Sequence, residues 1–166
     1  MLIRCPSLRD AICRLGACRQ GNTAVEFGLV APILVLLAFG AFDYGSAWVE
    51  SVRLNGAARA GAQQALYNSQ NWQNTAQMEQ AALEEYAGHA LTQAEIDVMP
   101  VGATANAFCA CTAGLTLACT DTCPGGEAPG QFVSVTLNNM TPLTLPYPWA
   151  EGDSVQVDGQ AVVRVR

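Results

Sequence analysis

The hydrophobic pattern of the chain is dominated by one long apolar run near the N-terminus. Sixteen uncharged residues separate Glu26 from Asp43, and the apolar character extends on both sides, to Ala24 and to Val49. A segment of about 20 predominantly apolar residues is long enough to cross the hydrocarbon core of a bilayer. Residues 24–49 are therefore predicted to form a membrane-spanning helix.

The helical pattern continues beyond Asp43, because no proline lies between Asp43 and Tyr67. Small and aliphatic residues recur there at spacings of four, as Leu54, Ala58, Ala62 and Leu66 in one row and as Ala57, Gly61 and Ala65 in the next. Rows with this spacing lie on one face of an α-helix. We predict one helix over 22–67, roughly 70 Å long at about 1.5 Å per residue, whose second half leaves the membrane and packs on the exported part of the chain.

The rest of the pattern predicts a second helix and then strands. The second helix is expected from Thr75 to about Leu91, after a polar loop at 68–74. Strands are predicted at 96–99, 105–111, 131–138 and 155–165, and alternation is clearest where Val133, Val135 and Leu137 share one face. The predicted fold class is α+β, with a long N-terminal helix, a shorter second helix and a small antiparallel sheet.

Two features of the strand region leave its topology open. Asp158-Gly159 suits a two-residue hairpin turn, so the last run forms either one strand or two. The segment 140–149 contains three prolines, which argues against an interior strand and predicts a path along the sheet edge. Tyr147 and Trp149 in this segment are expected to cover the open end of the core.

The charge distribution divides the chain at the apolar run. The leader before it carries Arg4, Arg9, Arg14 and Arg19 against Asp10 alone. Arginine on the near side of a first span holds that side in the cytoplasm, so the C-terminal part should be exported. We interpret 1–21 as a cytoplasmic targeting leader outside the fold, 22–67 as the long helix and 68–166 as the exported domain.

The exported part is strongly acidic. Thirteen acidic residues follow Gly21 against four arginines, a formal charge of −9. Nucleic-acid binding requires clustered Lys and Arg that displace counterions from phosphates. The composition therefore excludes a nucleic-acid partner.

Cysteines are also divided between the two sides of the predicted span. The leader contains Cys5, Cys13 and Cys18, and the exported part contains Cys109, Cys111, Cys119 and Cys123. Four cysteines in a small oxidised domain predict two disulfides in one of three pairings. A Cys109–Cys111 bridge would close too tight a loop, whereas a hairpin would nest Cys111–Cys119 inside Cys109–Cys123. Zinc is disfavoured because paired Cys-x-x-Cys knuckles are missing, so no metal is predicted.

Glu26 is anomalous at the edge of the apolar run. A carboxylate there costs a few kcal/mol, by order of magnitude, unless something offsets it. One interpretation is that Glu26 ends the span at the interface, where a helix N-terminus favours negative charge. The other interpretation comes from a resemblance to a known family.

The residues around Glu26 resemble a known processing site. Gly21 followed by Asn22 and later by Glu26-Phe27 is similar to the site at which a membrane aspartyl peptidase cuts type IV prepilins after the glycine. The longer string, with Val30-Ala31-Pro32 and a leucine-rich run, resembles the TadE-like pseudopilins of tight-adherence pilus systems. The portion from Arg53 to Arg59 also resembles the Arg-x-Gly-Ala segment of these proteins. The ending Ala-Val-x-Arg-Val is similar too, and it favours one continuous last strand.

The resemblance implies a pilin-like fold and a role in assembly. Cleavage would make Asn22 the new N-terminus, and Glu26, beside Phe27, would meet the terminal ammonium of a neighbouring subunit. The implied partners are a prepilin peptidase, other pseudopilins or pilins, and pilus assembly proteins of the bacterial inner membrane, without a cofactor. The Glu26-Phe27 pair and the large body differ from major pilins, so the expected role is a minor component that assembles or primes a pilus for attachment and biofilm formation.

The sequence predicts no enzyme. His89 is the only histidine and follows a glycine on the second predicted helix, so no nucleophile, base and orienting group are visible together. Two other functions remain open: an export signal cut after Gly40 or Ala47 that releases a periplasmic binding domain, or an uncut signal-anchored envelope protein. The mature N-terminus distinguishes these alternatives from a pseudopilin.

Overall fold

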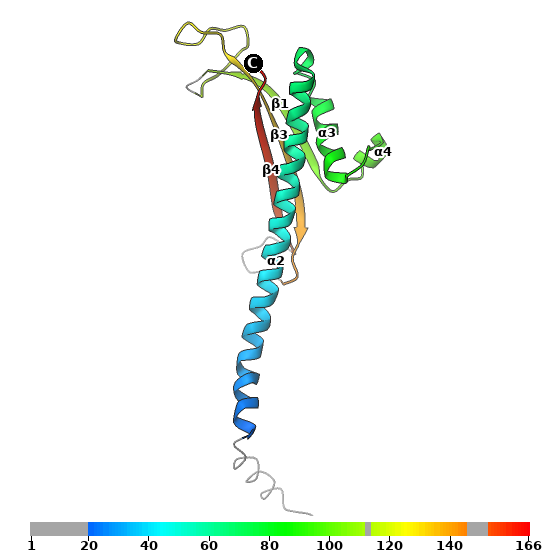
Figure 1. The fold of residues 1–166 in the computed structure, drawn as a ribbon, viewed down its shortest axis with the longest axis vertical. Coiled ribbons are helices and arrows are strands. Elements are labelled where there is room, and N and C mark those ends of the chain that lie inside the picture. The colour runs from blue at the N-terminus through cyan, green and yellow to red at the C-terminus, as the bar shows by residue number, and fades with distance from the viewer. Residues whose placement is uncertain (1–19, 112–113, 146–152) are drawn as a thin grey trace, which may run out of the picture. The chain divides into compact units, whose positions relative to one another are not determined.

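The computed structural model describes residues 20–111, 114–145 and 153–166, with side chains from Ala24 onward. The chain divides into two units, with the boundary between Phe42 and Asp43. Helix α2 (Gln20–Tyr67) supplies the described part of the first unit and the first 25 residues of the second (Figure 1). The helix ends at Tyr67, as predicted, and begins two residues before Asn22. The second unit, Asp43–Arg166, is called the head below.

Three short helices follow α2 in the head. They are η1 (Ser69–Asn71), α3 (Thr75–Ala87) and α4 (Gln93–Ile96). Helix α3 starts at the predicted residue, where the side chain of Asn74 accepts a hydrogen bond from the backbone N–H of Gln77 at 3.4 Å. It ends four residues earlier than expected, because Gly88 adopts a left-handed conformation with φ of 78°.

The strand predicted at 96–99 is wrong. A helical turn, α4, occupies Gln93–Ile96 instead. Glu95 accepts hydrogen bonds from the backbone N–H and the hydroxyl of Thr92, at 2.8 and 2.7 Å. This capping box starts a helix where the β-branched and aliphatic residues that follow favour a strand. The same hydrogen bonds lower the pKa of the Glu95 carboxyl.

The head contains one antiparallel sheet of four strands in the order β2-β1-β3-β4. Its strands are β1 (Gly102–Ala110), β2 (Thr116–Leu117), β3 (Gly130–Pro142) and β4 (Ser154–Arg164). The α+β class is therefore confirmed, and β4 is one strand rather than two. Strand β3 continues into the proline-containing segment as far as Pro142, which pairs with Ser154. Pairing with β1 stops at Asn138, so the proline lies where β3 has β4 as its only neighbour. Tyr147 and Trp149 lie outside the described residues.

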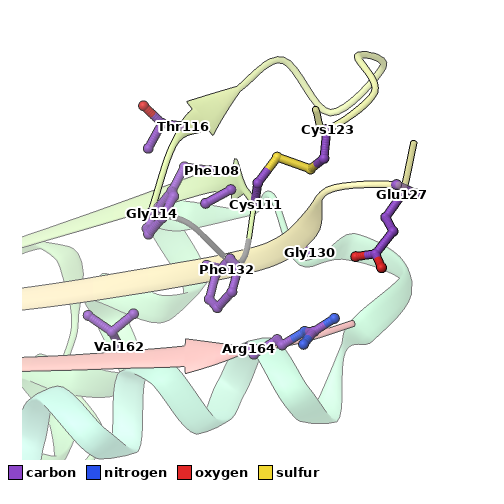
Figure 2. Close-up of a pocket in the computed structure, with 12 residues that line it drawn as sticks. Phe108, Cys111, Gly114, Thr116, Cys123, Glu127, Gly130, Phe132, Val162 and Arg164 are labelled. Atoms are coloured by element: carbon purple, nitrogen blue, oxygen red, sulfur yellow. A yellow bond between two sulfur atoms is a disulfide. The ribbon is translucent and has the colours of Figure 1, made fainter. Parts of the chain in front are cut away.

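The four cysteines of the head form two disulfides, but the nested pairing predicted for a hairpin is wrong. One bridge joins Cys109 to Cys119. The other joins Cys111 to Cys123 (Figure 2). The hairpin turns directly after Cys111, whose backbone N–H donates to the carbonyl of Leu115 at 2.9 Å. Cys119 therefore lies beyond the end of β2, close to Cys109, and a further turn brings Cys123 back to Cys111.

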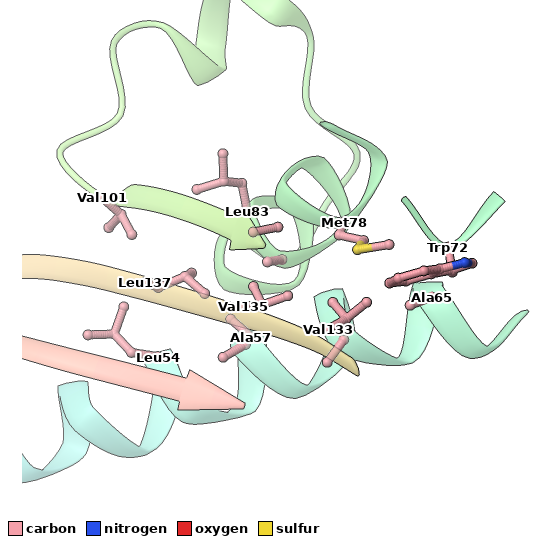
Figure 3. Packing of buried hydrophobic residues seen from close by; sticks show 14 of the residues in the cluster. Leu54, Ala57, Ala65, Trp72, Met78, Leu83, Val101, Val133, Val135 and Leu137 are labelled. Atoms are coloured by element: carbon pink, nitrogen blue, oxygen red, sulfur yellow. The ribbon is translucent and has the colours of Figure 1, made fainter. Parts of the chain in front are cut away.

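The core of the head lies between one face of the sheet and the helices α2 and α3 (Figure 3). Its strand side is the predicted face of β3, where Val133, Val135 and Leu137 are each 0% exposed. Both predicted rows of α2 contribute, except for Leu66, which is exposed. The buried helix residues are Leu54, Ala57, Ala58, Ala62 and Ala65 of α2 and Met78, Ala82 and Leu83 of α3. Burial of these apolar side chains is the main force that stabilises the head.

Helix α2 approaches strand β4 very closely at Gly159. A Cβ atom at this position would lie 2.6 Å from the Cβ of Leu54, so only glycine fits. In the sequence, Gly159 suggested a hairpin turn. In the structure, it allows α2 and β4 to approach each other closely. Next to it, the side-chain oxygen of Asn55 accepts a hydrogen bond from the backbone N–H of Gln160 at 3.2 Å, at the outer edge of the sheet.

Candidate processing and assembly segment

The predicted processing and assembly residues all lie at the start of α2. Gly21 and Asn22 have helical backbone, and Glu26 and Phe27 follow in the next turn, with their side chains exposed. The rise of about 1.5 Å per residue separates Asn22 from Glu26 by roughly 6 Å along the helix axis. The structure thus brings the predicted residues together on one element, while the four cysteines belong to the head.

The apolar part of α2 is largely exposed among the described residues. Almost every large side chain from Val25 to Phe42 is exposed, including Phe27 at 67% and Leu29 at 72%. Among the described residues, α2 is the helix that is long and apolar enough to cross a membrane. Such an exposed apolar surface requires lipid or protein around it.

Asp43 begins the head and is buried, with 4% of its surface exposed. Its carboxylate accepts the backbone N–H groups of Thr144 at 2.9 Å and Leu145 at 3.4 Å. A buried carboxylate needs hydrogen-bond donors, and these two amides follow strand β3. In the sequence Asp43 marks only the end of the apolar run, and nothing there reveals donors about a hundred residues away.

Glu50 links three elements of the head through one carboxylate. The hydroxyl of Tyr86 on α3 and the side-chain amide of Asn139 on β3 donate to the same oxygen, at 2.5 and 2.7 Å. Arg53 lies 3.7 Å from the other oxygen and 4.9 Å above the Tyr86 ring. Burial and the neighbouring Glu50 raise the pKa of Tyr86, so this phenol stays a hydrogen-bond donor well into alkaline solution. No sequence motif pointed to this cluster.

A cavity of about 440 Å³ lies beside the Cys111–Cys123 disulfide, on the outer face of the sheet (Figure 2). Phe108 and Phe132 stack across β1 and β3 with ring centroids 5.7 Å apart, and the guanidinium of Arg164 lies 5.9 Å from the Phe132 centroid. The cavity has an apolar floor and a volume typical of sites that bind small ligands. The sequence did not reveal this cavity, because its cysteines were interpreted only as cross-links.

The described residues offer little that could hold a metal or perform chemistry. No three His, Cys, Asp or Glu side chains gather as metal ligands in the described ranges. His89 is exposed, and its Nδ1 atom lies 3.3 Å from the carbonyl of Ala87.

Comparisons with known proteins agree with the resemblance seen in the sequence. The model of the TadE-like protein family matches residues 21–63, which cover the apolar segment and most of the rest of α2. Searches among curated proteins and solved structures find no match. Residues 21–63 are therefore similar to the TadE-like protein family.

Proposed function

We propose that this protein is a minor pseudopilin that supports the assembly or priming of a tight-adherence pilus, and thereby attachment and biofilm formation. A prepilin peptidase cuts it after Gly21, and the mature chain crosses the bacterial inner membrane once, with the head in the periplasm. The observation that supports this best is helix α2, which is apolar and exposed over 24–42 and supplies core residues of the head between Leu54 and Ala65. Such a helix carries a membrane anchor directly into a folded domain. The TadE-like match over the same helix supports the association with a pilus.

Glu26 has a specific part in this proposal. Cleavage after Gly21 creates an ammonium group at Asn22, and Glu26 pairs with the ammonium of a neighbouring subunit. Pairing lowers the cost of placing either charge in apolar surroundings. Phe27, exposed next to it, contributes apolar contact area to the same neighbour.

The alternative function is a periplasmic binding domain, either secreted or signal-anchored. The cavity beside Cys111–Cys123 favours it, because its size suits a small ligand. A cut after Ala47 would remove Asp43 and leave the amides of Thr144 and Leu145 without their acceptor, whereas a cut after Gly40 or no cut would keep it. We prefer the pseudopilin because the TadE-like match covers residues 21–63.

The mature N-terminus tests these functions directly. The full-length chain is expressed together with a prepilin peptidase, and its N-terminal peptide is identified by mass spectrometry. The proposal expects Asn22, a secreted domain would begin at Ala41 or Trp48, and an uncut anchor would retain Met1. A matched culture without the peptidase should yield the uncut chain.

A further inference from the structure

The outer face of the sheet carries a row of three large side chains on neighbouring strands. Phe108 of β1 pairs with Phe132 of β3, which in turn pairs with Arg164 of β4. The next row on this face pairs Ala110 with Gly130. Side chains of a strand that are two residues apart point to the same face, so a row of large groups is followed by a row of small ones. This change in size leaves the space of the cavity of about 440 Å³ (Figure 2).

Arg164 is held in place beside this cavity. A Cβ atom at Gly130 would lie 3.0 Å from the Phe132 ring and 3.2 Å from the Nε atom of Arg164, so the glycine lets both side chains pack onto the strand. The Nε atom also donates a hydrogen bond to the carbonyl of Arg166 at 2.9 Å. Among the described residues, no carboxylate forms an ion pair with this guanidinium. Its terminal N–H groups are therefore positioned to bind a ligand.

A carboxylate, that of Glu127, lines the same cavity. Glu127 closes a tight turn, because its carbonyl accepts a hydrogen bond from the backbone N–H of Cys123 at 2.9 Å. Gly126, the residue before it, adopts a left-handed conformation with φ of 82°. The Cys111–Cys123 disulfide ties this turn to the residue that follows β1. The turn and the bridge together hold Glu127 near the sheet.

The two charged side chains are found at the same end of the cavity. Figure 2 shows Glu127 and Arg164 toward the end at Gly130, and Phe108 toward the other end. Both charged side chains are exposed, and among the described residues they form no ion pair with each other. The cavity thus offers a cation and an anion at one end, and an apolar floor that leads away from them.

We propose that this cavity binds a small zwitterion with an aromatic side chain, of the class of the aromatic α-amino acids. Such a ligand carries its carboxylate and its ammonium on one carbon, so both can meet Arg164 and Glu127 at one end of the cavity. A planar guanidinium binds a carboxylate through paired hydrogen bonds. Phe108 and Phe132 supply apolar contact area for the ligand's ring. The inference goes beyond the proposed function, because it concerns the head alone and requires neither an anchor nor cleavage.

Other classes of ligand match this cavity less well. A phosphorylated ligand or a simple aromatic carboxylate would pair with Arg164 but would bring its negative charge close to Glu127, which opposes binding. A neutral sugar, or a segment from the middle of a peptide chain, would leave both charges without a partner. A zwitterion satisfies both side chains at once.

The test measures the binding of L-phenylalanine to the full-length chain in nanodiscs by isothermal titration calorimetry. Three matched analogues are compared with it: 3-phenylpropanoate lacks the ammonium, 2-phenylethylamine lacks the carboxylate, and N-acetylphenylalanine amide lacks both charges. L-phenylalanine should bind with a Kd below about 1 mM. It should bind about fivefold more tightly than either singly charged analogue, because each analogue loses one charge contact at the exposed end of the cavity.

Two substitutions assign the charges. Glu127→Gln should weaken L-phenylalanine about fivefold but should not weaken 3-phenylpropanoate, which has no ammonium. Arg164→Gln should weaken L-phenylalanine and 3-phenylpropanoate but not 2-phenylethylamine. Glu85→Gln and Arg59→Gln are the matched controls, because they remove exposed charges of the head outside this cavity and should leave binding unchanged. Since Glu127 is exposed, circular dichroism of its variant should show an unchanged fold.

Three outcomes would overturn the proposal. The first is a lack of saturable binding of L-phenylalanine at about 10 mM. The second is binding of any of the three analogues as tight as that of L-phenylalanine, which would indicate a site for a different class of ligand. The third is an equal loss of affinity in the control variants. None of these titrations depends on cleavage after Gly21, so they can succeed or fail independently of the processing experiment.

Discussion

The carboxylate of Asp43 accepts the backbone N–H of Thr144 at 2.9 Å, although 101 residues separate the two in the chain. The bond joins the first residue of the head to the segment that follows β3. Leu145 donates to the other carboxylate oxygen. The segment after β3 is therefore held to α2 at the point where the apolar run ends.

Replacement of Asp43 by alanine should destabilise the head by roughly 1–3 kcal/mol, because two backbone donors lose a buried acceptor. The Asp43→Asn variant retains one oxygen acceptor and should lose less. Thermal unfolding of the full chain in detergent, followed by circular dichroism, measures both. Equal melting temperatures for wild type and Asp43→Ala would show that these hydrogen bonds contribute nothing to stability.

Gly159→Ala should destabilise the head by about 1–3 kcal/mol, because the new methyl group would overlap Leu54 on α2. The matched control is Gly56→Ala on the exposed side of the same helix. There the methyl group meets open space, and alanine should stabilise the helix by up to about 1 kcal/mol. The midpoints of chemical denaturation of the two variants should thus shift in opposite directions from that of wild type. An unchanged midpoint for Gly159→Ala would contradict the close approach of α2 and β4.

Tyr86→Phe should cost roughly 1–2 kcal/mol, because Glu50 loses one of its donors. The raised pKa of Tyr86 adds a pH dependence: its contribution is complete below about pH 10, the pKa of an unperturbed tyrosine, and is lost as the pH rises through the raised folded-state value. Unfolding free energies measured from pH 8 to 11 should fall less steeply for Tyr86→Phe than for wild type. Parallel curves would argue against the raised pKa.

The disulfide pairing can be tested with double serine variants. Removal of Cys109 with Cys119, or of Cys111 with Cys123, should leave one intact bridge and cost about 2–4 kcal/mol. Removal of Cys109 with Cys123 should instead leave Cys111 and Cys119 as thiols that react with iodoacetamide. Peptide mapping by mass spectrometry distinguishes the variants, and an efficient Cys111–Cys119 bridge in the last one would contradict the observed pairing.

Glu26→Ala should leave cleavage after Gly21 mostly intact but impair pilus assembly, since the new ammonium group loses its partner. Gly21→Arg should block cleavage itself, because a bulky cation replaces the residue at the cut. Immunoblots of the mature chain and counts of surface pili separate the two steps. Normal piliation of cells that carry Glu26→Ala would argue against charge pairing.

Regular patterns in the sequence were enough to predict the core. The alternation at Val133, Val135 and Leu137 identified the buried face of β3, and the spacing of four at Leu54, Ala58 and Ala62 identified the buried side of α2. These patterns succeed because burial on a strand or helix repeats with a fixed period.

Predictions failed where one local or distant contact decides the structure. Thr92 and Glu95 form a capping box that the sequence displays, and it overrides the strand tendency of the residues after it. The partners of Asp43 and Glu50 lie on distant segments, so no local pattern could reveal them. The disulfide pairing depended on where the hairpin turns, and the turn at Cys111 was not evident from spacing.

The hydrogen bond from Gln160 to Asn55 has a consequence for how these molecules can associate. Strand β4 is an outer strand of the sheet, and open edges invite strand pairing between molecules. Asn55 occupies the N–H of Gln160 in the middle of that edge, next to the crossing of α2. Helix α2 thus leaves one backbone donor fewer at the open edge of the sheet for a strand of another molecule.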